Sequence, residues 1–241
     1  EPSADPTSDG AAAPPEPVEL KATSWEVVGR VAVIRLARPH RNNAWTGRMH
    51  HEYRALIARA ETDPDIRCVV VTGEGRSFCV GADSEALAGH VQKGGYDSGL
   101  PEDMPTPGYG VRDDYDDDFV FHYGLRTPVI VAINGPCAGV GFVLACYADL
   151  RYAARGIRLT TANARLGLPA EYGLSWVLPR LVGVTRASEL LMTGRRFRAE
   201  EAAEWGLFND VVDSDELMAH VMEVAGGLAE AGHDVQHARG Q

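Results

Sequence analysis

The stretch "INGPCAGVGFVLACYAD", from Ile133 to Asp149, changes from a strand pattern to a helix pattern within a few residues. The apolar run "TPVIVAING" predicts a buried strand that leads into it, and the apolar positions predict a helix from Gly139 onward. Glycines and alanines crowd the change from strand to helix. Because such small residues let another group come close to the backbone, the stretch predicts a point of close approach to the main chain.

A second stretch, "CVGAD" from Cys79 to Asp83, has the same design. It follows the short apolar run "CVVVTGEG", which predicts another strand buried on both faces. A helix that starts after such a strand leaves its first backbone N–H groups without helical acceptors. Two such groups aimed at one point form an oxyanion hole, which stabilises a negatively charged oxygen. Tight packing of helices on a sheet, with no ligand, explains the same spacing and stays open at this point.

The composition is that of a soluble globular protein. Of the 241 residues, 45% are apolar and 24% are charged, and the net charge of -11 argues against a general nucleic-acid binder. No apolar run approaches the roughly 20 residues of a membrane span. We expect the cysteines to be buried free thiols, which predicts a reducing compartment and a cytoplasmic location. They are Cys68, Cys79, Cys137 and Cys146.

Three segments divide the chain. Residues 1–22 are rich in Pro, Ala and acids, match no signal peptide and are expected to be disordered; the missing initiator Met indicates a trimmed or partial N-terminus. Residues 23–212 are the predicted core, and residues 213–241 a C-terminal helical segment. Within the core, residues 94–118 are rich in Gly, Pro and acids and predict a long mobile loop of the kind that often lies over a site.

The elements of the core follow from periodicity and capping residues. "SWEVVGRVAVIRLAR" predicts a hairpin around Gly29 and Arg30, and Thr46 caps a helix with one apolar face. A further helix is predicted from about Ser84, and Pro179 is expected to end or bend the first part of a later one. The remaining strands are predicted at 149–154, 157–162 and 207–213, and the remaining helices at 173–183, 185–194, 198–206 and 214–232.

Three motifs stand in a fixed order along the chain: "RSFCVGADSEAL", then "TPVIVAINGPCAGVGFVLACYADLRYAA", then "RLGLPAEYGLSWVLPRLVGVTRASELLMTGRRFRAEEAAEWGLFNDVV". Together they resemble the crotonase superfamily, the enoyl-CoA hydratases and isomerases, from about Val27 to Leu217. The resemblance implies an α/β fold, a spiral of β-β-α units followed by a helical segment that builds trimers or hexamers. Members usually continue for several more helices, so the C-terminal segment is expected to be truncated.

The resemblance also assigns roles to the two turns. It implies that the backbone N–H groups of Ala82 and Val140 hold the thioester oxygen of an acyl-CoA. Many members have glycine at the second position, and valine leaves the N–H intact. The segment "NNAWT", from Asn42 to Thr46, is similar to the one that lines the CoA adenine pocket. Arg76 stands where a basic residue often meets a CoA phosphate, with a solvated turn arginine as the alternative. The resemblance thus places Asn43, Ala44, Trp45, Arg76, Val80, Asp83, Leu87 and Gly139 in the set that binds substrate or CoA.

The proton-transfer residues depart from the hydratase pattern. Typical hydratases of the superfamily use two glutamates, and the matching positions here hold Val143 and Asn163, neither of which can act as a general base. Glu171 in "LPAEYGLSW" matches the catalytic glutamate of one branch of Δ3,Δ2-enoyl-CoA isomerases. A single base suffices for isomerisation, because it can remove a proton from C2 and return it at C4. The alternative role of Glu171 is to cap the helix that starts near Leu174.

Other polar residues have weaker claims. For Asp83, the alternative to a role in binding is a structural role, such as capping a helix. The acidic run from Asp113 to Asp118 predicts a solvated loop and not a metal site. His122 and Tyr123 could reach the site, but a satisfied surface position is favoured for the histidine. The two further histidines expected to be exposed are His50 and His51.

Three functions stay open from the sequence. The first is an acyl-CoA double-bond isomerase that uses Glu171. The second is a hydratase whose second acid comes from the loop at 94–118. The third is a non-catalytic acyl-CoA-binding protein that kept the oxyanion hole and lost the base. In each case an acyl-CoA is the expected small-molecule partner and a homotrimer or hexamer the expected assembly, with no separate cofactor, metal, nucleic acid or membrane partner.

Overall fold

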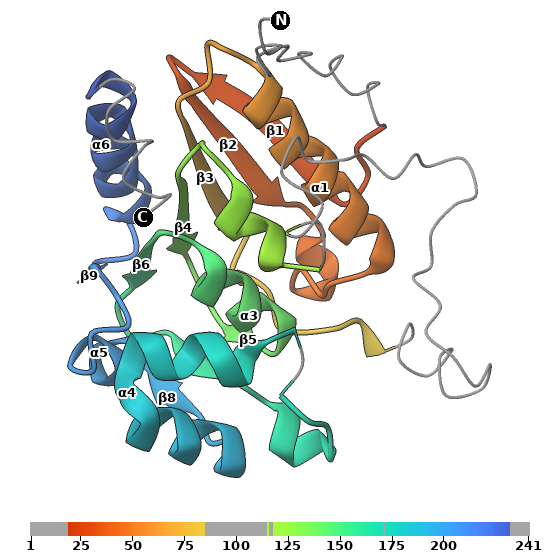
Figure 1. The fold of residues 1–241 in the computed structure, drawn as a ribbon, viewed down its shortest axis with the longest axis vertical. Helices are drawn as coiled ribbons and strands as arrows, with labels where there is room; N and C mark the ends of the chain where they lie inside the picture. The colour runs from red at the N-terminus through yellow and green to blue at the C-terminus, as the bar shows by residue number, and fades with distance from the viewer. Residues whose placement is uncertain (1–18, 85–114, 116–117, 171, 232–241) are drawn as a thin grey trace, which may run out of the picture.

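The computed structural model describes residues 19–84, 115, 118–170 and 172–231 (Figure 1). Its main sheet has six strands in the order β1-β2-β3-β4-β6-β9. β1 and β2 form an antiparallel hairpin, and the later neighbours are parallel. The strands are β1 (Thr23–Val28), β2 (Val31–Leu36), β3 (Cys68–Gly73), β4 (Val129–Ile133), β6 (Leu150–Ala154) and β9 (Asp210–Val212).

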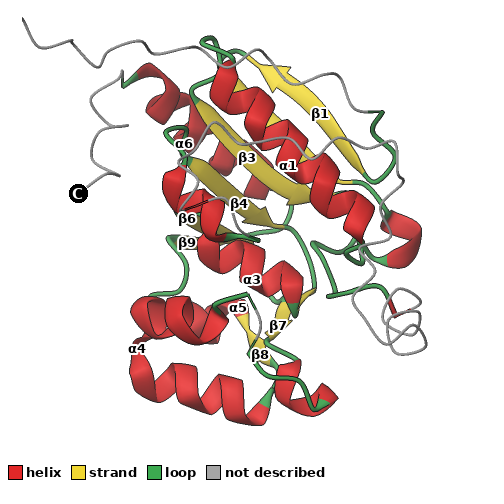
Figure 2. Cartoon of the chain, turned by 45° about the vertical axis from the view of Figure 1, so that its right-hand side comes forward, coloured by secondary structure: helices red, strands yellow, loops and turns green. Residues whose placement is uncertain are grey.

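A smaller sheet lies next to the helices at the other end of the molecule (Figure 2). Its strands are β5 (Cys137–Ala138), β7 (Arg158–Thr160) and β8 (Phe197–Arg198). The α-helices are α1 (Gly47–Thr62), α3 (Val140–Tyr147), α4 (Leu174–Thr193), α5 (Ala199–Ala203) and α6 (Leu217–Glu230). Short 3-10 helices are η1 (Pro39–Arg41), η3 (Val120–Gly124) and η4 (Asn163–Leu166). The order β1-β2-α1 and then β4-β5-α3 matches the predicted β-β-α units.

The central strands β2, β3 and β4 are buried on both faces, with α1 over one face of the sheet and α6 over the other (Figure 1). Successive residues of a strand point to opposite faces. In β2, Ala32 and Ile34 pack in the cluster that contains α1, whereas Val31 and Val33 pack in the cluster that contains α6. This two-sided burial explains why β3 and β4 are continuous runs of apolar or small residues, as the sequence predicted.

The capped helix after the hairpin is also confirmed. The Thr46 hydroxyl accepts a hydrogen bond from the N–H of Met49 at 3.1 Å, which satisfies one donor of the first turn of α1. The apolar positions that the 3.6-residue period places on one face are all buried. They are Met49, Tyr53, Leu56, Ile57 and Ala60.

The prediction that Pro179 ends the first part of this helix is wrong. α4 continues through Pro179 and breaks at Gly183, whose φ of 77° and ψ of 157° are not helical, at the boundary between the helices predicted at 173–183 and 185–194. Proline removes the hydrogen bond that its N–H would give to the carbonyl of Ser175 and crowds that carbonyl, but Ser175 is exposed, so water can bond to it instead. Glycine takes a positive φ without a steric cost, and so it marks the break.

The predicted exposure of three histidines is wrong as well. His122 is fully buried: its Nδ1 lies 2.9 Å from the carbonyl oxygen of Phe119, and its Nε2 lies 2.8 Å from the hydroxyl of Tyr53. The carbonyl can only accept, so Nδ1 carries the proton and Nε2 accepts from the tyrosine. His51 is buried and His50 half-buried. Aromatic rings from segments distant in the sequence cover this part of α1, which its own periodicity does not reveal.

Several expectations fall outside the described residues: the tail at 1–18, the helix after Ser84 and, apart from Tyr115 and Asp118, the loop at 94–118. Ala22, just before β1, is buried. α6 confirms a helix in the C-terminal segment. The four cysteines are buried free thiols, as predicted. No helix in the part of the chain that the structure describes is long and apolar enough to cross a bilayer.

Candidate active site

The two glycine-containing turns meet in space, at the ends of β3 and β4. The N–H of Ala138 donates to the carbonyl of Cys79 at 2.9 Å, and Cys79 and Cys137 form a parallel bridge. A Cβ on Gly139 would lie 3.5 Å from the Cα of Gly81, so the two glycine backbones are in contact. Both have a positive φ, 106° for Gly81 and 49° for Gly139. The close approach predicted from the small residues is therefore an approach of these two turns to each other.

The N–H of Ala82 is oriented by the backbone on either side of it. Trp45 donates its N–H to the carbonyl of Gly81 at 2.8 Å, and Asp83 donates its N–H to the carbonyl of Trp45 at 2.9 Å. Backbone groups of successive extended residues point to opposite sides of a strand. The N–H of Ala82 thus points away from Trp45, and no described residue accepts a hydrogen bond from it.

The N–H of Val140 is available for a different reason. Val140 is the first residue of α3, and the first N–H groups of a helix have no acceptor within the helix. Among the described residues none accepts a hydrogen bond from this N–H. All eight residues of α3 are buried, so the helix is packed firmly against its surroundings. The N-terminus of this helix also favours negative charge.

The segment predicted to line the adenine pocket is locked in place by Asn43, which is fully buried with φ of 56°. Its side-chain oxygen accepts from the N–H of Arg38 at 2.8 Å. Its amide donates to the carbonyls of Glu74 and Ser77, at 2.9 and 2.8 Å. The polar atoms of Asn43 are thus engaged with the protein, and Ala44 and Trp45 are buried beside it.

The other residues assigned to binding are spread around the Ala82 turn. Arg76 is exposed and donates from Nε to the side-chain oxygen of Asn42 at 3.1 Å. Val80 is exposed, and Gly139 lies in the second turn. Asp83 is buried, and its carboxylate faces two arginines. Leu87 lies outside the described residues.

Those arginines, Arg38 and Arg41, are residues that the sequence analysis missed. Nη2 of Arg38 lies 3.0 Å from Oδ2 of Asp83, and Nη2 of Arg41 lies 3.1 Å from Oδ1. The acid and the arginines are more than 40 residues apart in the chain, and no local pattern links them. The charges in "RPHR", just before the predicted binding segment, are the only signal that could have drawn attention to them.

The two positions that hold glutamates in typical hydratases are buried. Val143 is 2% exposed within α3. Asn163 is 7% exposed, and its amide donates to the carbonyl of Pro169 at 2.7 Å. Glu171 lies outside the described residues, but its neighbour Tyr172 has a left-handed φ of 54°. The carbonyl of Tyr172 accepts a hydrogen bond from the hydroxyl of Tyr147, at the end of α3, at 2.8 Å.

We expect Tyr147→Phe to lower the free energy of unfolding by about 1 kcal/mol, because it removes this hydrogen bond from a residue held in a strained conformation. Denaturant unfolding of the purified variant measures the change. Tyr152→Phe is the matched control, since Tyr152 is a buried tyrosine of β6 for which no described residue bonds to the hydroxyl. Equal stability of the two variants would show that the Tyr147 hydroxyl does not hold the turn.

The thiol of Cys79 lies directly behind the two turns and is fully buried. Burial raises its pKa to about 12, and burial also raises the pKa of Cys146 to about 12. Because the thiolate is the reactive form of cysteine, neither side chain is a nucleophile near neutral pH. The neutral sulfur of Cys79 also places no negative charge beside the paired turns.

His50 packs edge-on against Trp45 and Phe119, with ring centroids 6.0 and 5.4 Å away. Burial, followed by the nearby charges of Arg54 and His51, lowers the pKa of His50 to about 3. The imidazole is therefore neutral in the folded chain at any pH near neutrality. In the unfolded chain the same group titrates near pH 6.5.

Acid should therefore destabilise the protein through His50. Below pH 6.5 the unfolded chain binds a proton at this residue that the folded chain does not, so stability is complete above pH 6.5 and is lost as the pH falls toward 3. We expect the stability advantage of the wild type over His50→Gln to shrink by about 2 kcal/mol between pH 6.5 and pH 5. Denaturant unfolding of both proteins at each pH measures this change. A difference in stability between the two proteins that stays constant with pH would contradict the lowered pKa of His50.

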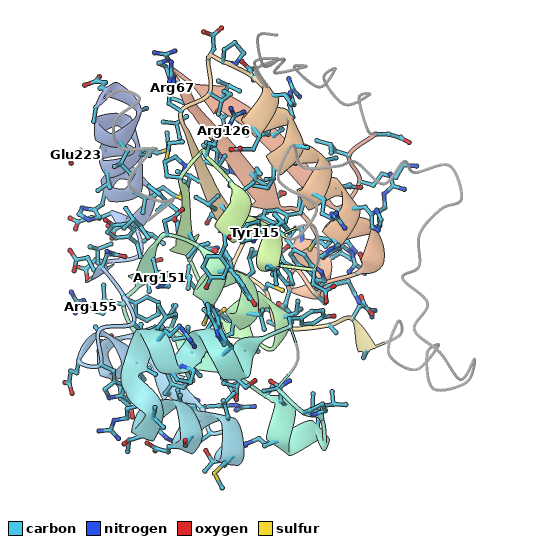
Figure 3. All side chains as sticks on the ribbon, viewed as in Figure 1. Arg67, Tyr115, Arg126, Arg151, Arg155 and Glu223 are labelled. Atoms are coloured by element: carbon cyan, nitrogen blue, oxygen red, sulfur yellow. The ribbon has the colours of Figure 1, made fainter. Side chains whose placement is uncertain are left out.

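A cavity of about 290 Å³ lies elsewhere, at the opposite ends of the same strands. Arg67 and Arg126, which precede β3 and β4, line it and are labelled in Figure 3 at the end of the sheet away from α4. The carboxylate of Glu61 accepts the N–H groups of Arg126 and Thr127 there, at 3.0 and 2.7 Å. Over the residues described, no three His, Cys, Asp or Glu side chains gather so as to hold a metal ion.

A model of the enoyl-CoA hydratase/isomerase family matches residues 26–239, and the chain belongs to this family of enzymes. The resemblance drawn from the three motifs is thereby confirmed.

Relatives of this chain include proteins named as isomerases and proteins named as hydratases. The 1,2-epoxyphenylacetyl-CoA isomerase of Escherichia coli is 34% identical over 201 residues, which cover 83% of this chain and 72% of that protein. The probable enoyl-CoA hydratase EchA12 of Mycobacterium tuberculosis is 36% identical over 204 residues, which cover 83% and 68%. The crystal structure of an enoyl-CoA hydratase from Mycobacterium marinum has a TM-score of 0.72 at 37% identity, covering 90% of this chain and 94% of that one.

Proposed function

We propose that this protein isomerises the double bond of an enoyl-CoA thioester, with Glu171 as the base. The N–H groups of Ala82 and Val140 hold the thioester oxygen. Glu171 removes a proton from C2, the electrons of that C–H bond move toward the carbonyl, and the oxygen becomes negative. The same glutamate returns the proton at C4, so the double bond moves from C3–C4 to C2–C3 without any other reactant.

The observation that carries this proposal is the chemistry of the two positions where typical hydratases have glutamates. Val143 has no titratable group, and Asn163 uses its amide as a donor to Pro169. Addition of water needs one group to activate the water and a proton delivered to the neighbouring carbon. Isomerisation needs one base only, and Glu171 is the carboxylate whose position matches the catalytic glutamate of one branch of Δ3,Δ2-enoyl-CoA isomerases.

The oxyanion hole supports the chemistry whichever side chains flank it. Both donors belong to the main chain, so alanine at 82 and valine at 140 leave them in place. Removing one donor from such a hole typically costs about 3–4 kcal/mol in the transition state. The neutral thiol of Cys79 behind the turns leaves the negative oxygen unopposed.

One observation favours hydration as the second candidate: relatives at 36% identity are named probable enoyl-CoA hydratases. A hydratase would need its second acid from residues 94–118, which contain Glu102, Asp103 and the run that ends at Asp118. Because isomerisation has no such requirement, we favour it over hydration.

The test supplies the purified protein with 3-hexenoyl-CoA and, separately, with 2-hexenoyl-CoA. Isomerisation makes the first thioester conjugated and raises its ultraviolet absorbance, whereas hydration of the second destroys conjugation and lowers it. We expect the rise and no fall. A fall without a rise would overturn the proposal in favour of hydration. Binding of both thioesters by calorimetry with no spectral change would indicate a protein that binds acyl-CoA without acting on it.

A further inference from the structure

The carboxylate of Asp83 lies beside the first N–H donor and is held more tightly than a surface acid. Its side chain is 4% exposed and contacts both Arg38 and Arg41, at 3.0 and 3.1 Å. The side chains of these arginines are 20% and 36% exposed. A buried carboxylate is costly unless cations and hydrogen bonds compensate it, so this arrangement fixes all three side chains relative to one another.

The two arginines belong to the segment that runs to Trp45. Arg38 also donates from Nη1 to the carbonyl of Ala44 at 2.6 Å, and its N–H donates to the side chain of Asn43 at 2.8 Å. Arg38 thus connects the carboxylate of Asp83 to the backbone just before Trp45. The backbone of Trp45 cannot shift relative to Asp83 without breaking these contacts.

Trp45 in turn sets the orientation of the peptide that carries the donor. The Gly81–Ala82 peptide presents its carbonyl to the N–H of Trp45, at 2.8 Å, and its own N–H to the opposite side. Gly81 has a φ of 106°, and glycine allows a wide range of backbone angles, so this peptide could rotate if its partner moved. A rotated peptide would point a carbonyl oxygen at the thioester oxygen in place of an N–H.

We propose that Asp83, with Arg38 and Arg41, is a positioning residue that keeps the Gly81–Ala82 peptide in the orientation in which its N–H faces the thioester oxygen. This inference rests on the proposed oxyanion hole and deepens it. Asp83 does not touch the reacting atoms; it acts through Trp45. Its effect therefore falls on the strength of the hydrogen bond to the thioester oxygen.

The test uses Asp83→Asn, which keeps the shape and the backbone N–H of the residue and removes the charge. The readout is the infrared stretch of the thioester carbonyl in bound hexanoyl-CoA labelled with ¹³C at that carbon, a ligand that cannot isomerise. Hydrogen bonds to a carbonyl oxygen lower its stretching frequency. We expect a clear lowering in the wild type and a smaller one in Asp83→Asn.

The kinetic readout is the isomerisation of 3-hexenoyl-CoA. We expect kcat to fall about tenfold in Asp83→Asn, with KM changed less than about threefold, because a misaligned donor is a partial loss of an interaction made in the transition state. Glu189→Gln is the matched control, since Glu189 of α4 also pairs with two arginines, Arg186 and Arg195, and should leave both readouts unchanged.

Different outcomes would overturn the proposed oxyanion hole and the role of Asp83. A wild type that binds hexanoyl-CoA with no lowered carbonyl frequency would overturn the proposed oxyanion hole itself. A lowered frequency that Asp83→Asn fully retains would overturn only the role of Asp83, as would a raised KM at unchanged kcat. If Asp83→Asn does not fold, Arg41→Gln removes the more exposed partner alone. It should shift both readouts in the same direction by less, and no shift in it would also overturn the inference.

Discussion

Glu171→Gln should lower the kcat of the proposed isomerisation by about 10³-fold. Glutamine keeps the size and polarity of the side chain but cannot accept the C2 proton at neutral pH. General acid–base catalysis by one positioned group contributes about 10²–10⁴-fold, and this reaction uses the same group in both of its steps. Absorbance of the conjugated thioester formed from 3-hexenoyl-CoA measures the rate.

Binding separates this outcome from a loss of structure. The proposed oxyanion hole consists of main-chain groups, so Glu171→Gln should retain the lowered carbonyl frequency of bound hexanoyl-CoA and an unchanged affinity by calorimetry. Glu204→Gln is a control in which an exposed glutamate near the end of α5 is changed with no expected effect. Turnover of Glu171→Gln within a few-fold of the wild type would remove Glu171 from the chemistry and leave it the role of helix cap.

The sequence predicted the parts of the fold that depend on local pattern and on two-sided burial. β3 and β4 are buried along their whole length, so every residue is apolar or small and the strands stand out from their surroundings. α1 has a single capping residue, Thr46, and a regular apolar period. In these elements the local preference and the tertiary environment agree.

The failed predictions of histidine exposure concern contacts between distant segments. His50 stands on the side of α1 that its own period assigns to solvent, yet Phe119, about 70 residues later, packs on it at a centroid distance of 5.4 Å. The pairing of Asp83 with Arg38 and Arg41 is equally distant in the chain. Patterns in a single sequence carry no information on such pairs. The contacts of Asp83 with Arg38 and Arg41 are therefore visible only in the structure.

For the site, the sequence predicted the meeting of two turns but not how they are held. The small residues at Gly81 and Gly139 are needed because the two backbones touch. The motif order gave the candidate donors Ala82 and Val140, and their catalytic role stays a prediction. Trp45 was assigned to the CoA pocket, and the structure adds that its backbone orients the first donor.

Gly141→Ala should separate the two turns and lower kcat by about 100-fold. A Cβ at this position would lie 2.6 Å from both the Cβ and the carbonyl oxygen of Cys79, and 2.9 Å from its sulfur. Neither backbone nor a fully buried side chain can yield at that distance without moving α3 away from the first turn. Since Val140 starts α3, its N–H moves with the helix, and loss of one donor typically costs 10²–10³-fold.

The same substitution should lower the free energy of unfolding by about 1–3 kcal/mol, the usual cost of inserting a methyl group into a packed interior. Gly226→Ala is the matched control: a Cβ there meets no atom within 4 Å, so alanine in α6 should leave kcat unchanged and stabilise the helix by up to about 1 kcal/mol. Denaturant unfolding and the isomerisation assay on both variants measure the two effects. A Gly141→Ala protein with wild-type kcat would mean that the close contact between Gly141 and Cys79 does not set the distance between the donors, and the geometry of the hole would need another basis.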